Sequence, residues 1–325
     1  FLFGWAGGLL IMIISYALIF RGEDAVTRPD GYNSYAILGS VMMAGTVLVS
    51  ALAQHKYVAQ PSPPRPANSG RLRDALFEMR ETLSNGPFIK LISATLFAFI
   101  SQAITFAMTN YLMIYVWRLD QNGLAIYGIS LFFSVIIAFL LVGPISARAG
   151  KKGGAVITTL LSLLIFILLY TAWLTRIFPG APDASVKWLM FLIFNLSNAF
   201  AICTMILNSS MMADVVEASQ FETGRRSEGL FFAGYFFMQK CAVGTGIFLT
   251  GIILSMAQFP QNATGGNVPL PILDNMVIYY VSGISLLSIT YAMLLQRFPI
   301  GQEDHDARLA ILAGRTAGSP DATKE

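Results

Sequence analysis

The chain of 325 residues contains 55% hydrophobic residues and only 12% charged residues, and its mean hydropathy is +0.63. Soluble domains carry about twice that charge, so the composition excludes a soluble globular protein and predicts an all-α integral membrane protein. The net charge of +3 requires no nucleic-acid partner, because membrane proteins concentrate Lys and Arg on one side of the bilayer.

Eight apolar stretches are long enough to cross a bilayer as helices. In chain order they are 1–20, 33–57, 88–117, 124–147, 154–176, 187–213, 229–258 and 274–297. The first stretch begins at Phe1, with neither an initiator Met nor the charged start of a signal peptide. We therefore expect a longer protein whose N-terminal part precedes this sequence.

A polar linker, residues 58–87, interrupts the apolar pattern. Apolar residues between Leu72 and Leu83 follow helical spacing, with charged residues at the other positions. This pattern is typical of an amphipathic helix on the membrane surface, and a helix packed on its own protein fits it equally well. The linker divides the chain into 1–57, the linker itself, a six-helix part at 88–298 and a tail at 299–325.

Basic residues gather in the linker, in the connections after the fourth and sixth stretches, and in the tail. The positive-inside rule places these segments, and therefore the linker and the C-terminus, in the cytoplasm.

Lys240 is a lone cation in the middle of the stretch 229–258. A Lys at the centre of a membrane helix costs roughly 2.5–3.5 kcal/mol, and such residues are usually functional and paired. All 18 Asp and Glu fall in predicted loops, tails or helix ends. Lys240 is therefore either neutral or paired with a carboxylate outside this sequence; a Lys reaching towards the membrane surface is the structural alternative.

Polar side chains inside the predicted spans are candidates for a solute cavity. Hydroxyls and amides suit a polyol ligand, and hydrogen bonding between helices explains them equally well. On the third and sixth stretches, side chains at helical spacing share a face. The candidates are Trp5, Gln102, Thr105, Thr109, Tyr111, Asn195, Asn198, Tyr235 and Gln239.

Opposite charges crowd a predicted cytoplasmic loop around residues 214–228. Ion pairs there can hold the cytoplasmic ends of helices together as a gate, whereas a solvated loop gains little from such pairs. The gate candidates are Arg148, Asp214, Glu222, Arg225, Arg226 and Glu228. No cluster with catalytic or metal-ligand spacing occurs in the sequence, and both histidines, His55 and His305, lie at a membrane edge or outside. A membrane-embedded enzyme is therefore disfavoured.

Four strings carry a family resemblance. GPISARAGKKGG resembles the cytoplasmic loop after the second helix of each half in the major facilitator superfamily. MMADVVEASQFETGRRSEGLFFAGYFFMQK, LSNGPFIKLI and FPIGQEDHDARLAILAGR resemble the glycoside–pentoside–hexuronide:cation symporter family, which includes the melibiose carriers. Asp214 and Lys240 have the same separation as their counterparts in those carriers. The tryptophan of their tenth helix falls at Met205, which disfavours a galactoside.

The resemblance implies the fifth to twelfth helices of a twelve-helix carrier in a bacterial inner membrane. It implies monomeric, cation-coupled symport of a sugar, glycoside or related polar solute by alternating access, with Na⁺ or H⁺ as the coupling ion and no cofactor. Lys240 would supply the positive charge that balances a carboxylate pair on the second helix, which precedes Phe1. A carrier of a lipid or another non-sugar solute with the same fold is the alternative.

Overall fold

The computed structural model describes residues 29–58, 84–177, 184–223, 227–263 and 268–299, with Arg80 and scattered positions between 7 and 20. The predicted linker helix, the tail after Pro299 and most of the first predicted span lie outside the described residues. Trp5, Arg225 and Arg226 do so as well.

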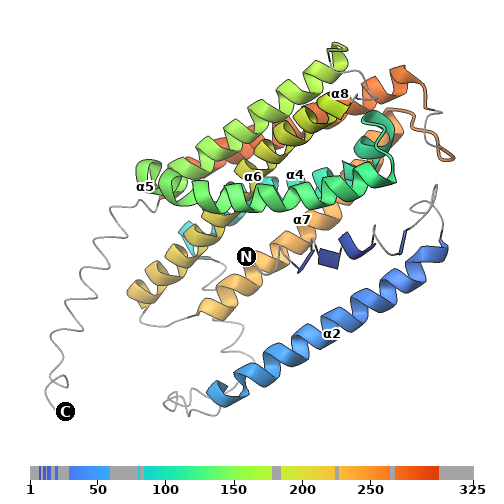
Figure 1. Ribbon diagram of the computed structural model, residues 1–325. Coiled ribbons are helices and arrows are strands. Elements are labelled where there is room, and N and C mark those ends of the chain that lie inside the picture. The colour runs from blue at the N-terminus through green and yellow to red at the C-terminus, as the bar shows by residue number, and fades with distance from the viewer. Residues whose placement is uncertain are drawn as a thin grey trace, which may run out of the picture. The chain divides into compact units, whose positions relative to one another are not determined.

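Long helices make up almost all of the described chain (Figure 1). Their bounds are α2 Asp30–Val58, α4 Gly86–Tyr111, the π-helix η2 Leu112–Val116, α5 Gln121–Leu174, α6 Ala184–Thr223, α7 Glu228–Met256 and α8 Leu270–Leu295. Six of the described helices are long and apolar enough to cross a membrane. Helices are the expected form, because hydrocarbon offers backbone groups no water and a helix satisfies them internally.

The 54 residues of α5 form two membrane spans. At 1.5 Å per residue a straight helix of this length would measure roughly 80 Å, more than twice the hydrocarbon thickness. At Gly150 the backbone has φ 68° and ψ 170°, and the chain turns back on itself there (Figure 1). The two arms of α5 correspond to the predicted spans 124–147 and 154–176.

The start of α4 follows from its sequence. The Asn85 side chain accepts a hydrogen bond from the backbone N–H of Phe88 at 3.0 Å, which caps the free end of the helix. Pro87 occupies the first turn, where its missing N–H costs no hydrogen bond.

The contacts group the residues into two compact units, Phe1–Met79 with Leu119–Phe133, and Arg80–Arg118 with Ser134–Glu325. In the first unit, Phe20 packs on Tyr32 and Tyr35, with ring centroids 5.0 and 6.0 Å apart. The second unit, called the helical bundle below, contains α4, η2, most of α5, and α6 to α8.

Within the helical bundle, α4 packs chiefly against α7 and α8. The rings of Phe88 and Phe231 meet edge to face at 5.1 Å, near the starts of α4 and α7. Further along, Gly246 of α7 lies directly against Ala103 of α4: a Cβ at Gly246 would collide with the Ala103 Cβ and lie 3.0 Å from the Ile100 carbonyl oxygen. The two helices therefore run in the same direction at close range, as small residues allow in membranes.

We predict that Gly246→Ala destabilises the protein by about 1–3 kcal/mol, because the new methyl group must push α7 away from the α4 backbone. This is the net loss, after the gain in helix propensity of about 1 kcal/mol that alanine brings over glycine. Gly251→Ala on the same helix is the matched control, because a Cβ added at Gly251 would have no other atom within 4 Å. The thermal unfolding midpoint of the purified full-length protein measures both; equal midpoints would contradict the close approach.

We also predict that Gly150→Ala costs about 1–3 kcal/mol, because this backbone conformation is almost exclusive to glycine. Gly153→Ala is the control: its Cβ would meet only the Ala149 Cβ at an ordinary 3.6 Å. Chemical or thermal unfolding of the two variants should separate them, with only Gly150→Ala clearly destabilised.

Candidate functional site

Hydrogen bonding separates the polar residues of the spans into two groups. A polar side chain inside a membrane needs a partner, so one already bonded to a neighbouring helix contributes to packing. One without a full set of partners inside the protein is a better candidate for a solute or ion.

Several of the cavity candidates have their hydrogen bonds inside the helical bundle. Asn195 accepts a bond from Ser134 at 2.6 Å and donates to the Phe191 carbonyl at 2.7 Å. Thr105 and Thr109 donate to carbonyls one turn earlier in α4, at 3.0 and 2.7 Å. Tyr235 is buried, and its ring meets Phe99 edge to face at 5.3 Å. In this structure Asn195, Thr105 and Thr109 hold helices together or satisfy their own helix, and the Tyr235 ring packs on the Phe99 ring of α4.

Other candidates keep hydrogen-bonding capacity. Gln102 makes a single hydrogen bond within the described residues, from Nε2 to the Met205 sulfur at 2.9 Å. Asn198 and Gln239 are half-buried, and their side chains make no hydrogen bond to any residue that the structure describes. Tyr111 is half-buried in an aromatic group with Tyr115 and Phe259, at centroid distances of 6.4 and 5.5 Å.

Lys240 lies on α7 and is exposed. No described side chain forms an ion pair with it. Glu228, the acidic residue of the first turn of α7, is twelve residues earlier, which is about 18 Å along the helix. Lys240 is six residues before Gly246 and therefore about 9 Å from the level at which α7 crosses Ala103. The backbone of Lys240 thus lies well inside the span, twelve residues from the described carboxylate of its own helix, Glu228.

The turn at Gly150 is followed by a pair of lysines that join three helices. Lys151 Nζ lies 2.6 Å from a carboxylate oxygen of Asp214 on α6. Lys152 Nζ donates to the Phe298 carbonyl, just beyond α8, at 3.1 Å. The sequence predicted charge in this turn but did not identify Lys151 as the partner of Asp214, because the two lie far apart along the chain.

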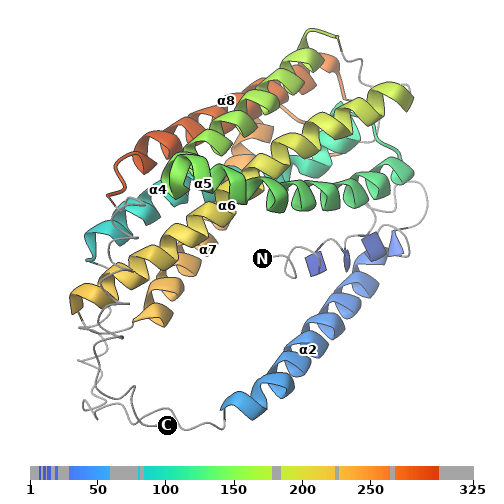
Figure 2. The ribbon, with the colours of Figure 1, turned by 60° about the vertical axis from the view of Figure 1, so that its left-hand side comes forward.

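The loop expected around residues 214–228 is shorter than predicted. Helix α6 continues to Thr223, beside the first turns of α7 (Figure 2). Buried side chains explain the extension, because Val215, Val216 and Ala218 pack inwards. Asp214 is therefore a buried helical residue with 7% of its surface exposed. The gate candidates Arg148, Glu222 and Glu228 are exposed.

A row of buried and half-buried hydroxyl groups that the sequence did not single out joins α5 to α6. Thr204 lies 2.8 Å from Thr158 and 3.0 Å from Thr159. Ser162 and Ser197 each donate to the other's backbone carbonyl, at 2.8 and 2.9 Å. Ser and Thr residues four positions apart along α5 could have indicated a polar contact with a neighbouring helix. The sequence does not show which helix lies opposite, so it could not identify their partners.

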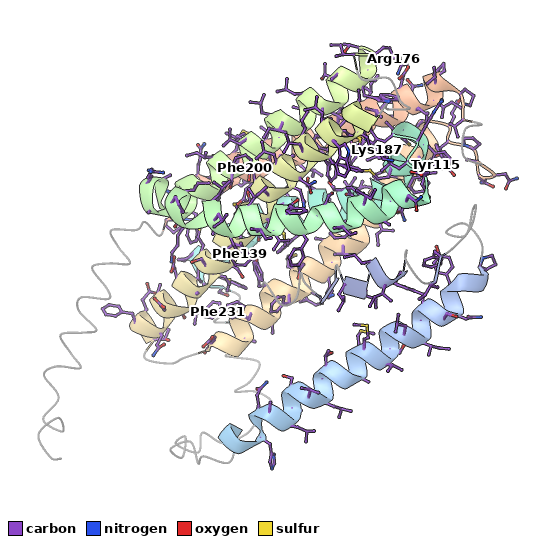
Figure 3. The ribbon with its side chains drawn as sticks, viewed as in Figure 1. Tyr115, Phe139, Arg176, Lys187, Phe200 and Phe231 are labelled. Atoms are coloured by element: carbon purple, nitrogen blue, oxygen red, sulfur yellow. The ribbon has the colours of Figure 1, made fainter. Side chains whose placement is uncertain are left out.

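The opposite end of the helical bundle has its own ion pair. Arg176 contacts both carboxylate oxygens of Asp274, at 2.9 and 2.7 Å, and its guanidinium group lies over the Trp173 ring. Figure 3 shows Arg176, Lys187 and Tyr115 towards this end and Phe231 towards the other. Within the described ranges, no group of three or more His, Cys, Asp or Glu is placed to hold a metal ion.

A sequence profile of the family described as MFS/sugar transport protein matches residues 1–302. The chain belongs to this family. MFS/sugar transport proteins are membrane transporters rather than enzymes, and the major facilitator architecture agrees with the all-helical spans found here.

Three curated proteins show the range of its relatives. A putative sulfoquinovose importer of Salmonella typhimurium is 26% identical over 63% of this chain and 41% of the relative. An uncharacterized symporter of Synechocystis sp. is 23% identical over 82% of this chain and 47% of the relative. A putative 2,3-dihydroxypropane-1-sulfonate exporter of Escherichia coli K12 is 25% identical over 69% of this chain and 46% of the relative. The match thus spans less than half the length of each of these relatives.

We predict that Lys151→Met destabilises this MFS protein by about 1–3 kcal/mol, because it removes the cation beside a buried carboxylate. The double variant Lys151→Met/Asp214→Asn should recover part of the loss, since the carboxylate charge is then gone as well. Arg148→Gln, an exposed basic residue three positions earlier, is the control. Unfolding midpoints that are the same for Lys151→Met and Arg148→Gln would contradict a stabilising pair.

Proposed function

We propose that the full-length protein is a secondary active transporter that carries a sugar or related polar solute together with a cation, by alternating access. The observation that supports this most directly is Lys240, a cation exposed deep inside a span without a carboxylate partner among the described residues. Family membership supports sugar transport, and one relative carries the name symporter.

In this proposal Lys240 couples the cation to the movement of the carrier. Carboxylates elsewhere in the full-length protein attract the ammonium group when their cation site is empty. When Na⁺ or H⁺ occupies that site, the attraction weakens, because the carboxylate charge is already neutralised. An empty carrier with unneutralised charge would be costly to reorient, so solute and cation cross together.

Amide groups without a full set of partners among the described residues support a hydroxylated solute. Gln102, Asn198 and Gln239 offer amides, which suit the hydroxyl groups of a sugar or polyol. Two relatives are named for sulfonated solutes, sulfoquinovose and 2,3-dihydroxypropane-1-sulfonate. Uptake tests should therefore include sulfonated and acidic sugars as well as neutral glycosides, since Lys240 offers such an anion a positive charge. A lipid or another non-sugar solute remains the alternative.

We further propose that the end of the helical bundle with Lys151 faces the cytoplasm of a bacterial cell, where Arg148, Asp214, Glu222, Arg225, Arg226 and Glu228 contribute to an inner gate. The basic residues of that end support this orientation. In the proposed cycle, ion pairs at the gate hold the inner side closed and break when it opens. We expect the transporter to act as a monomer.

Lys240→Ala in the full-length protein should abolish uphill accumulation in proteoliposomes, because without the ammonium group the carboxylates of the empty carrier stay unneutralised and the empty carrier cannot reorient to complete the cycle. Lys90→Ala, which removes an exposed lysine in the first turns of α4, is the matched control and should retain accumulation. The measurement is uptake of neutral glycosides, hexuronates and sulfonated sugars under a Na⁺ gradient or a proton gradient. Uphill uptake by Lys240→Ala at the wild-type level would refute the coupling role.

A further inference from the structure

We infer that the Gln102 carboxamide recognises a hydroxyl group of the solute by hydrogen bonding. Until the solute displaces the thioether, Met205 holds this carboxamide in position. The inference rests on the proposed transport of a hydroxylated solute and assigns specificity to one pair of side chains on α4 and α6.

The contact between Gln102 and Met205 leaves most of the amide unsatisfied. A Gln side chain has two N–H donors and a carbonyl oxygen with two lone pairs, whereas a thioether sulfur is a weak acceptor. One N–H is directed at the sulfur, at 2.9 Å, and this is the only bond of the side chain within the described residues. Such a group inside a membrane is stabilised by any better partner that reaches it.

The neighbours of both residues have stronger partners elsewhere. On α4, the Thr105 and Thr109 hydroxyls donate to carbonyls of their own helix. On α6, the Thr204 hydroxyl lies against threonines of α5, and the Cys203 thiol points to the Ala138 carbonyl at 3.4 Å. Met205 is thus turned away from the row of hydroxyls and towards α4.

Apart from the Gln102–Met205 bond, α4 and α6 make little contact with each other. α4 packs mainly on α7 and α8, so the Gln102–Met205 bond is a polar bridge across a weakly packed seam. α4 and α6 run in opposite directions along the helical bundle (Figure 2). Thr109 lies two turns after Gln102 on α4. Asn198 lies two turns before Met205 on the same face of α6. Asn198 is a second amide without a described partner, about 10 Å along the seam.

The chemistry fits a neutral hydroxyl group. A hydroxyl can donate to the Gln102 carbonyl oxygen and accept from its N–H, which replaces one weak bond with two ordinary ones. A site that bonds a hydroxyl rejects the analogue that lacks it, because the amide is then left unsatisfied. The Gln102→Leu variant cannot make this distinction, because its side chain has no hydrogen-bonding group.

The test measures binding and uptake of mono-deoxy analogues of the best solute in the panel, with the full-length protein. For wild type, removing the hydroxyl that Gln102 recognises should weaken binding about 10-fold to 100-fold. Gln102→Leu should weaken binding of the parent solute by a similar factor and bind the deoxy analogue as wild type does. Met205→Leu, which keeps the volume but removes the sulfur, should bind the parent solute at least as tightly as wild type.

Thr95→Val is the control for a lost hydroxyl on the same face of α4, because Thr95 is fully buried and bonded to its own helix. It should leave the discrimination between parent and deoxy solutes unchanged. Gln102→Leu that weakens all analogues equally, or that weakens none, overturns the inference. Absence of binding by wild type to every hydroxylated solute also overturns it.

Because binding is measured without a gradient, the outcome for Gln102 is separate from that for coupled transport. A wild-type protein that binds the solute and discriminates through Gln102, but does not accumulate it uphill, contradicts the proposed symport and supports the specificity role.

Discussion

The absence of water from the hydrocarbon layer is the constraint on which this structure depends. It forces the backbone into helices, and it makes each polar side chain inside a span find a partner in the protein or remain costly. In the helical bundle, Asn195 and the hydroxyls of Thr158, Thr204 and Ser162 meet this requirement by bonding across helices. Among the described residues, Gln102, Asn198 and Gln239 keep hydrogen-bonding capacity, which makes them candidates for contact with a solute or ion.

The same constraint makes the helical bundle suited to move as one body. The close approach of Gly246 to the α4 backbone locks two helices together, and the hydroxyl row joins α5 to α6. At one end the Lys151–Asp214 pair fastens the α5 turn to α6, and at the other Arg176 fastens α5 to the start of α8. Bonds of this kind fix helices within the bundle, as the proposed alternating access by rocking of a rigid half would require.

Hydropathy was enough to predict the spans that the structure describes, because length and apolar content decide whether a segment crosses a membrane. It failed at the end of α6, where the hydropathy falls at Asp214 but Val215 and Val216 still pack inwards and carry the helix to Thr223. The sequence also identified Lys240, because a single charged residue in an apolar stretch can be recognised without a structure. The sequence could not tell which of Asn195 and Asn198 is hydrogen-bonded to another helix. The two are three residues apart, and the outcome depends on which helix lies opposite each side chain.

Lys151 and Lys240 illustrate how the surroundings, rather than the residue type, assign a role. Both are lysines of the helical bundle, but Lys151 lies 2.6 Å from a carboxylate at the end of a helix, where the pair stabilises a turn. Lys240 lies deep in a span, and the cost of its charge is not offset by any described carboxylate. A cost of this kind persists in a protein only when another state of the molecule compensates it. In the proposed carrier, that state would be one in which the solute, the cation or carboxylates outside the described residues come close to Lys240, which favours the coupling role proposed for it.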